Sequence, residues 1–216
     1  MYRKYVKRLL DIICALLAII VFSWLYIILA LLVRIKLGSP VIFKQKRPGK
    51  DEKIFELYKF RSMSNATDKN GNLLPDDQRL MKFGRILRST SLDELPEAWN
   101  ILKGDMSVVG PRPWAVSYLQ YFTPEEHRRH EVRPGLTGLA QVHGRTASSW
   151  DERLKYDIDY VDHVTFLNDL KIIALTVKKF LAREDIVEAK EQGDFSDYRK
   201  KQWEEGSVPR PEMYTK

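Results

Sequence analysis

The hydrophobic pattern of the chain begins with an unbroken apolar segment. Between Ile12 and Val33, IICALLAIIVFSWLYIILALLV, Ser23 is the only clearly polar side chain. As a helix rising about 1.5 Å per residue, this segment would reach roughly 33 Å, which is enough to cross the hydrocarbon core of a bilayer. A cleaved signal peptide fits less well, because the apolar run is too long and no small-residue cleavage site follows it. Hydropathy alone therefore favours one membrane-spanning helix.

The charges on both sides of this segment disagree with simple spanning. Residues 1–50 carry ten Lys and Arg side chains and one acid, Asp11, so the whole formal excess of +7 lies in this part of the chain. Basic flanks favour the cytoplasmic side, and here both flanks are basic. A helix that enters the membrane, bends and returns to the same face satisfies both. Such a bend needs a proline or a supporting side chain, and the segment offers only Ser23.

The period of the pattern changes after the apolar segment. Gly38-Ser39-Pro40 interrupts it, and residues 41–47 and 53–60 predict the two strands of a β-hairpin. Residues 64–77 are polar and predict a loop. Helical spacing then predicts further helices over residues 79–88, 92–102, 123–131, 150–160 and 167–183.

Two stretches fit neither the alternating pattern of a strand nor the spacing of a helix. Residues 133–145 contain too many glycines for a helix and are expected to line a site. Beyond about residue 184 the chain is polar with few apolar anchors, so no secondary structure is predicted there.

Composition narrows the functional classes. The 216 residues are 44% hydrophobic and 30% charged, which excludes a disordered chain. One cysteine excludes an intrachain disulfide, and the four histidines give no zinc spacing. His127 and His130 lie three apart on a predicted helix without a carboxylate or third ligand in register, and we expect them at the surface. Outside residues 1–50 the chain is slightly acidic, which disfavours nucleic acid as a partner.

The segment from Ser89 to Glu97, STSLDELPE, carries the most informative chemistry. Ser91 and Glu94 stand in capping-box spacing, so an ordinary helix start is one interpretation. Pro96 is tolerated only among the first amides of a helix, which favours a start at Asp93. Asp93 would then be the cap residue, with its carboxylate at the positive end of the helix dipole.

Such a position suits phosphate chemistry. Free amides and the helix dipole hold an anion, and they keep an aspartate ionised as a nucleophile. Arg88 precedes this turn, and Arg112 follows between two prolines. Guanidinium groups bind phosphate in a bidentate manner, although each arginine could equally be a surface charge.

Four motifs together resemble one known family. They are YKFRSM (58–63), RSTSLDELPE (88–97), KGDMSVVGPRP (103–113) and RPGLTGLAQV (133–142). In this order they look like the bacterial sugar transferases, the monotopic phosphoglycosyl transferases, and the match runs from the N-terminal arm to about residue 183. The short length resembles the small members of the bacillosamine-phosphate transferase type.

The resemblance implies a reaction and its parts. Members transfer a sugar-1-phosphate from a UDP-sugar to polyprenol phosphate, such as undecaprenyl phosphate, at the cytoplasmic face of the bacterial inner membrane, and release UMP. Asp93 is the implied nucleophile, which forms a phosphosugar-enzyme intermediate, with Glu94 as its dyad partner. Mg²⁺ is expected near Asp93 to neutralise the diphosphate. Small members commonly use N-acetylated amino sugars, although no residue here identifies the sugar.

Further basic residues lie in or beside the family motifs. Lys59, Arg61, Arg133 and Arg145 are expected to contact the diphosphate or the lipid phosphate, with ordinary surface pairing as the alternative for each. The resemblance also implies a re-entrant helix. Members often bend it at a Ser-Pro pair, and here the pair is Ser23-Trp24, so the bend would rest on Ser23 and packing.

The amphipathic stretches have two interpretations as well. An apolar stripe along residues 167–183 faces either a protein core or the membrane interface. It consists of Leu170, Ile173, Ala174, Val177 and Leu181. Four aromatic residues would suit the same interface: Trp114, Tyr118, Tyr121 and Phe122.

These patterns and the resemblance predict an α+β, mainly helical fold. A re-entrant membrane helix with basic flanks occupies residues 1–37. A catalytic part with a β-hairpin and amphipathic interfacial helices around a cytosolic active site occupies 38–183, and a polar tail follows over 184–216. Membrane lipids are expected partners, and the resemblance leaves a homodimer and downstream glycosyltransferases open. The competing hypothesis is a catalytically silent, membrane-anchored scaffold or regulator of glycan assembly.

Overall fold

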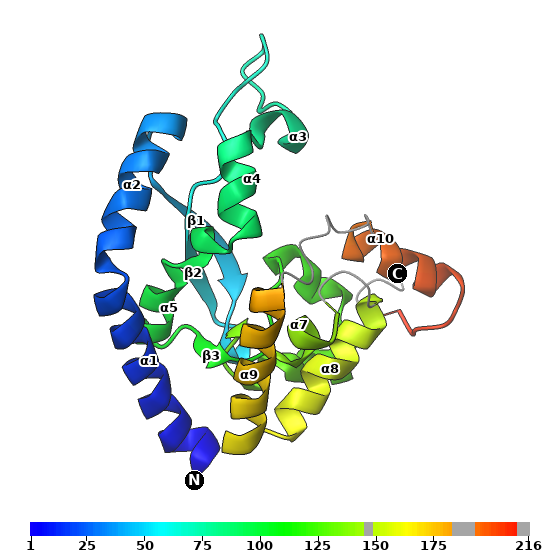
Figure 1. Ribbon diagram of the computed structural model, residues 1–216. Helices are drawn as coiled ribbons and strands as arrows, with labels where there is room; N and C mark the ends of the chain where they lie inside the picture. Colours follow the sequence, from blue (N-terminus) through cyan, green and yellow to red (C-terminus); the bar gives the residue numbers. More distant parts are fainter. Residues whose placement is uncertain (145–148, 183–192, 211–216) are drawn as a thin grey trace. The chain divides into compact units, whose positions relative to one another are not determined.

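The computed structural model describes residues 1–144, 149–182 and 193–210 (Figure 1). The chain divides into two compact units. The first comprises Met1–Lys7, Arg47–Phe55 and the chain from Ser107 onward, and the second comprises Arg8–Lys46 and Glu56–Met106. The described chain is mainly helical with two small two-stranded sheets, which agrees with the predicted α+β class.

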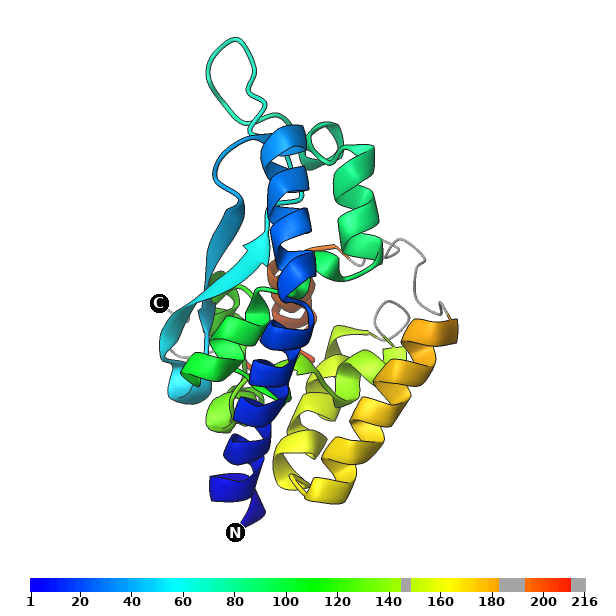
Figure 2. The same ribbon diagram turned by 60° about the vertical axis from the view of Figure 1, so that its left-hand side comes forward.

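The apolar segment forms two helices joined at a bend, α1 (Lys7–Val21) and α2 (Ser23–Leu37) (Figures 1 and 2). No single helix among the described residues is long and apolar enough to cross a membrane. The stretches Tyr2–Val21 and Ser23–Leu37 pass the length and composition test only as a pair, bent by 64°. The bend lies beside Ser23, but Ser23 is exposed and no side chain caps α2.

Contacts within the second unit hold both arms of the bend. Arg8 on α1 donates hydrogen bonds to the carbonyls of Ile101 (2.6 Å) and Leu102 (2.8 Å), which are among the last of α5 (Glu97–Lys103). These carbonyls belong to the last turn of α5, at the negative end of the helix dipole, so a guanidinium suits them. On α2, the hydroxyl of Tyr26 donates to the carbonyl of Leu95. Each arm is therefore held by its own contact.

The second unit builds its core between α2, the hairpin strand β2 (Ile54–Phe60) and α4 (Lys82–Ser89). The buried core residues are Leu29, Val33, Phe60 and Leu87. The hairpin of β1 (Ile42–Pro48) and β2 confirms the predicted strands, and its tip belongs to the first unit. A Cβ at Gly84 would lie 1.8 Å from the carbonyl oxygen of Ser62, so only glycine lets α4 pack so closely on the end of β2.

The first unit contains a small parallel sheet of β3 (Ser107–Val109) and β4 (Gly135–Thr137). Its core joins this sheet to α7 (Leu139–Gly144), α8 (Trp150–Asp162) and α9 (Phe166–Ala182). In both views α8 and α9 run side by side (Figures 1 and 2). The two long helices confirm the predictions for 150–160 and 167–183.

The glycine-rich stretch is structured, which corrects the expectation that residues 133–145 contain no helix. Its first half is β4, and Leu139–Gly144 forms α7. The glycines serve close backbone approach: a Cβ at Gly135 would lie 2.1 Å from the backbone nitrogen of Gly110. Glycine frequency therefore marked tight packing between β3 and β4 and not an irregular loop.

The C-terminal stretch also differs from the prediction of no structure. Residues Phe195–Glu204 form α10, whose Phe195 is fully buried. Phe195 packs in the first unit against an aromatic cluster with Phe122, Trp114, Tyr118 and Trp150. Of the four aromatic residues suggested for the membrane interface, Phe122 is buried in this cluster. Trp114, Tyr118 and Tyr121 are half-buried around it, and Tyr121 lies against Trp203.

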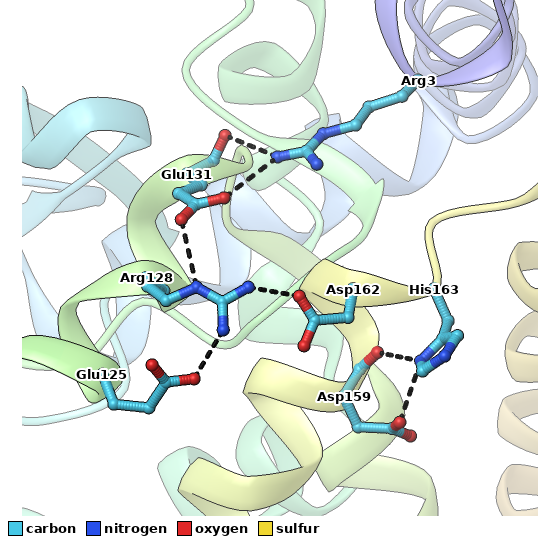
Figure 3. A network of polar contacts seen from close by, with 7 residues as sticks. All are labelled: Arg3, Glu125, Arg128, Glu131, Asp159, Asp162 and His163. Carbon is cyan, nitrogen blue, oxygen red and sulfur yellow. Dashed lines mark hydrogen bonds and ion pairs between the residues drawn. The ribbon is translucent and has the colours of Figure 1, made fainter.

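A short helical pair, α6 (Pro124–His127) and the 3₁₀ turn η5 (Arg128–Glu131), confirms the helix predicted over 123–131. Thr123 and Glu126 form a capping box at its start. Arg128 holds η5 through ion pairs with Glu125 and Glu131 and a further pair with Asp162 of α8 (Figure 3).

Candidate active site

The site that the motifs predicted centres on one 3₁₀ turn, η3 (Leu92–Glu94), in the second unit. Ser91 before it adopts a left-handed conformation (φ 53°) and its side chain caps nothing. The helix α5 begins only after Pro96, which occupies its N-cap position. The expected capping box of Ser91 and Glu94, and the expected cap at Asp93, are therefore wrong. Pro96 has no N–H to donate, so regular helical bonding starts beyond it.

Asp93 is a buried carboxylate held among charges, with 7% of the residue exposed. Burial raises the pKa of its carboxyl group, and the neighbouring charge of Glu94 acts in the same direction. The positive charges of Lys59 and Arg88 lower the pKa and offset part of this effect. Two side-chain cations and a backbone hydrogen bond therefore favour the ionised form of Asp93.

Lys59 of β2 connects the site to the hairpin. Its Nζ lies 2.6 Å from Oε1 of Glu94 and 3.2 Å from Oε1 of Glu97. Both glutamates are buried. Lys59 therefore lies among three carboxylates, counting Asp93, and Arg88 adds a second positive charge that acts on Asp93.

Two residues of this site were missed by the sequence reasoning, Glu97 and Asn100. Asn100 is fully buried, accepts a hydrogen bond from the backbone N–H of Tyr58 (3.0 Å) and donates one to the carbonyl of Glu56 (2.7 Å). These bonds fasten α5 to the strand that carries Lys59. Glu97 follows Glu94 by three residues, a spacing that places acids on one side of a helical segment and could have indicated it.

The predicted phosphate-binding arginines of the second unit differ in their surroundings. Arg88 is exposed and its Nε donates to the hydroxyl of Ser62 (2.9 Å), close enough to Asp93 to affect its pKa. Arg61 is buried, and its guanidinium donates to the carbonyls of Ser39 (2.6 Å) and Leu37 at the end of α2. These contacts favour phosphate binding by Arg88 and a structural role for Arg61.

The remaining predicted residues lie outside the second unit. Arg112 and Arg133 belong to the first unit, where both are half-buried. Arg129 donates to the carbonyl of Arg112 (2.8 Å) and so fixes the backbone between the two prolines. Arg145 falls in a stretch outside the described residues. The structure therefore gathers Asp93, Glu94, Lys59 and Arg88 in one unit, and holds Arg112 and Arg133 in the other.

An apolar pocket of about 370 Å³ lies in the second unit between α2, the hairpin and the start of α5. It is lined by Tyr26, Ile27, Ala30, Val41, Ile42, Tyr58, Phe60, Pro96 and Trp99. Side chains alternate along a strand, so Tyr58 and Phe60 point to the pocket side of β2 while Lys59 points to the carboxylates. One strand therefore carries both an apolar and a charged site.

The donor atoms around Asp93 fit a magnesium ion. Mg²⁺ binds oxygen ligands, and in phosphoryl-transfer enzymes it takes one or two carboxylates together with substrate phosphates. Asp93 and Glu94 offer two such carboxylates, which are adjacent in the chain and both buried.

Comparison with known proteins identifies the family. The family model of the bacterial sugar transferases matches residues 2–183. An uncharacterized sugar transferase of Bacillus subtilis, EpsL, is 51% identical over 180 residues, which cover 83% of this chain and 89% of that protein. The chain therefore belongs to the bacterial sugar transferase family, as its motifs predicted, and the expectation of an enzyme of the phosphoglycosyl transferase class is confirmed.

Two further relatives are named by their reactions. A UDP-glucose:undecaprenyl-phosphate glucose-1-phosphate transferase of Klebsiella pneumoniae is 44% identical over 183 residues, covering 80% of this chain and 39% of that protein. A protein of the same name from Caulobacter vibrioides is 38% identical over 194 residues, covering 83% of this chain and 71% of that protein. The chain thus spans less than half of the Klebsiella protein and most of the other two.

Proposed function

We propose that this chain transfers a sugar-1-phosphate from a UDP-sugar to polyprenol phosphate, which yields a polyprenyl diphosphate sugar and UMP. The names of the Klebsiella and Caulobacter relatives support this type of reaction. The observation that carries the proposal is the buried Asp93, adjacent to Glu94 and in the field of Lys59 and Arg88. A scaffold has no need of a buried carboxylate whose charge is only partly compensated.

The proposed mechanism is a double displacement at one phosphorus atom. A carboxylate oxygen of Asp93 attacks the phosphorus that bears the sugar, the bond from this phosphorus to the bridging oxygen breaks, and UMP leaves with the electron pair. An oxygen of polyprenol phosphate then attacks the same phosphorus and displaces the carboxylate of Asp93. Each step exchanges one P–O bond for another, so no redox partner is required.

The other charged residues of the second unit have complementary roles in this mechanism. Lys59 holds Glu94 and Glu97 in place and lowers the pKa of Asp93. Arg88 offers an exposed guanidinium for the diphosphate. Glu94, as dyad partner, is held by Lys59 beside the nucleophile, and its charge raises the pKa of Asp93. Asp93 would hold Mg²⁺, which supplies charge neutralisation to the diphosphate when bound.

The acceptor of this reaction is a lipid, and we propose that its isoprenoid chain contacts the apolar pocket beside α2. The pocket walls are almost entirely apolar carbon, and α1 and α2 expose many large hydrophobic side chains. Exposed apolar surface of this extent is typical of membrane contact. In this proposal the bent pair α1–α2 enters the cytoplasmic face of the bacterial inner membrane and returns to it.

The sugar is proposed to be an N-acetylated amino sugar, the type of donor in the name of a relative from Aeromonas hydrophila. Relatives are named for glucose, galactose and N-acetylgalactosamine transfer, so the family fold accommodates several donors. The experiment is a panel of UDP-sugars incubated with the chain, polyprenol phosphate and Mg²⁺, with UMP release as readout. Turnover with an N-acetylated donor at least tenfold above UDP-glucose supports the proposal, and a preference for UDP-glucose contradicts the choice of sugar.

The same panel separates the enzyme from the alternative scaffold. A membrane-anchored scaffold would keep the helices α1 and α2 but release no UMP from any donor. Asp93→Asn serves as the negative control, since residual UMP release in this variant measures contaminating activity.

A further inference from the structure

Three side chains that the proposed reaction does not use converge in the first unit. Glu52 lies in η2 (Lys50–Glu52) at the tip of the hairpin, while His127 ends α6 and His130 lies in η5. One ligand atom from each lies within 4.8 Å of the other two. The sequence had given no third ligand for the two histidines, because Glu52 is 75 residues away from His127.

The donor atoms already lie close to metal-binding geometry. Oε1 of Glu52 is 3.2 Å from Nδ1 of His130 and also pairs with Nδ1 of His127. Tetrahedral zinc with ligands at about 2.0–2.2 Å places its donor atoms about 3.3 Å apart, so binding would need only small side-chain shifts.

An ion pair with Glu52 does not explain the burial of His130. It is 6% exposed, which corrects the expectation of a surface position, and neither ring nitrogen makes a hydrogen bond within the described residues. A buried imidazole normally finds a partner for at least one nitrogen. An imidazole binds a metal ion through the lone pair of an unprotonated ring nitrogen, and the two ring nitrogens of His130 are buried without a hydrogen bond among the described residues.

The surroundings hold the three ligands in place. Phe122 packs against both imidazole rings, with ring centroids 5.8 Å from His127 and 5.6 Å from His130. The ion pairs of Arg128 with Glu125 and Glu131 (Figure 3) link α6 to η5, the two elements that carry His127 and His130. Glu52 is held at a positive φ of 58°, a conformation that is costly for glutamate and typical of functional positions.

The charge balance also permits a cation. Arg129 precedes His130 in the chain, but its guanidinium is bound to the buried Asp157 at 2.6 Å. A divalent ion bound to one carboxylate and two neutral imidazoles would therefore meet a compensated arginine and not a free one.

We propose that Glu52, His127 and His130 form a binding site for one divalent transition-metal ion, with Zn²⁺ as the best match to a His₂Glu ligand set. Two imidazole nitrogens and a carboxylate oxygen are the usual protein ligands of zinc. Glu52 and His127 are each more than a third exposed, so a water molecule completes the coordination from solvent. The ion ties the tip of the hairpin to η5 within the first unit.

The experiment uses the full chain in detergent, without a histidine tag, stripped by a chelator and dialysed into excess Mg²⁺. Mg²⁺ prefers six oxygen ligands and does not compete for imidazole. Titration with Zn²⁺, followed by calorimetry and by thermal unfolding, is expected to give one ion per chain and a Tm several degrees higher. Co²⁺ in place of Zn²⁺ is expected to give the visible absorption of a four- or five-coordinate complex.

Variants decide which residues bind the ion. Glu52→Gln and His127→Asn change exposed side chains and are expected to weaken Zn²⁺ binding at least tenfold and to lose the Tm shift, without affecting folding in the absence of metal. His163→Asn is the matched control, because His163 pairs with Asp159 at 3.0 Å and has no third ligand among the described residues (Figure 3). The proposal is overturned if the wild-type chain shows no saturable 1:1 binding, or if the control weakens binding as much as the other two variants.

Discussion

Burial of Asp93 lowers the stability of the fold and at the same time makes its carboxylate more reactive. Its carboxylate is buried with incomplete charge compensation, which raises its pKa. A carboxylate that is costly to bury is also a stronger base and a more available nucleophile than a solvated one. We therefore expect the nucleophile to be a residue whose burial lowers the stability of the folded state.

The substitution Asp93→Asn tests this trade directly. A carboxyl pKa raised by folding means that the folded state loses stability as the pH rises through that range, and asparagine removes this loss. We expect Asp93→Asn to abolish UMP release and to raise Tm by about 2–4 °C at neutral pH. The gain should shrink at acidic pH, where Asp93 is protonated. A thermal unfolding series over pH measures this, and the exposed Asp77→Asn is the control that should change neither property.

Lys59 is expected to set the acid limb of the pH profile. Its charge lowers the pKa of Asp93, so its removal raises that pKa further. In Lys59→Met, the decline of kcat/KM at low pH should therefore begin at a higher pH than in the wild-type enzyme. The exposed Lys82→Met should leave the profile unchanged. A profile with the same acid limb in Lys59→Met would argue that Asp93 is not the ionising group.

The residues of the site were predictable only as far as the motifs reach. Asp93, Glu94, Lys59 and Arg88 stand in family motifs, and the structure gathers them in one unit. Their local geometry was not predictable, because Pro96 moves the start of α5 past Asp93. The carboxylate therefore lies near side-chain cations and not at the N-cap of a helix. No local pattern distinguishes a guanidinium that binds phosphate from one that caps α2, as Arg61 does.

At the level of elements, β2 has an apolar side and a charged side. The apolar pocket lies against Tyr58 and Phe60, and Lys59 between them reaches the carboxylates. Such a strand can contact a lipid chain on one side and position the charged residues that act on the phosphate on the other. The pocket is then expected to affect the acceptor and not the sugar donor.

Ala30→Trp tests the pocket, because Ala30 lines it and an indole would fill much of its volume. We expect a rise of at least tenfold in KM for polyprenol phosphate, with UMP release from UDP-sugar in the absence of acceptor unchanged. Leu31→Trp places the same ring on the exposed side of α2 and is the matched control. Equal effects of both substitutions would contradict acceptor binding in the pocket.

The long periodic elements were predicted, and the short tightly packed ones were not. The patterns over 150–160 and 167–183 correspond to α8 and α9. The helix α7 was missed because its glycine-rich surroundings serve close packing against Gly110. The helix α10 was missed because a single buried residue, Phe195, anchors it in an otherwise polar stretch. Hydrophobic periodicity detects a helix that buries one whole face, and a single buried residue produces no such period.

At the level of the whole molecule, the positive charge of the N-terminal part has more than one use. Lys7 pairs with Asp169 of α9 at 2.6 Å, and Arg8 binds carbonyls at the end of α5. These residues tie the N-terminal arm to the fold, so only part of the basic flank is left for lipid headgroups. The apolar stripe of α9 is mostly exposed, with Leu170, Val177 and Leu181 each more than half exposed, which favours the interfacial interpretation over the core one.

The re-entrant topology predicts where each end of the chain can be labelled. In a Cys14→Ser background, single cysteines at Lys4 and Ser207 should react with a membrane-impermeant reagent from the same, cytoplasmic, side of inverted vesicles. The bend of 64° and the basic residues on both flanks support this outcome. Reaction of the two positions from opposite sides would establish a spanning arrangement.

The central claim is that Asp93 becomes covalently attached to the phosphosugar before any lipid takes part. The most direct measurement incubates the enzyme with UDP-sugar and Mg²⁺ in the absence of polyprenol phosphate, and follows UMP release together with the intact mass of the protein. The account predicts up to one equivalent of UMP, a mass gain of one phosphosugar on the peptide that contains Asp93, and neither in Asp93→Asn. UMP release that occurs only when the lipid is present, with no change in protein mass, would contradict it and indicate direct displacement.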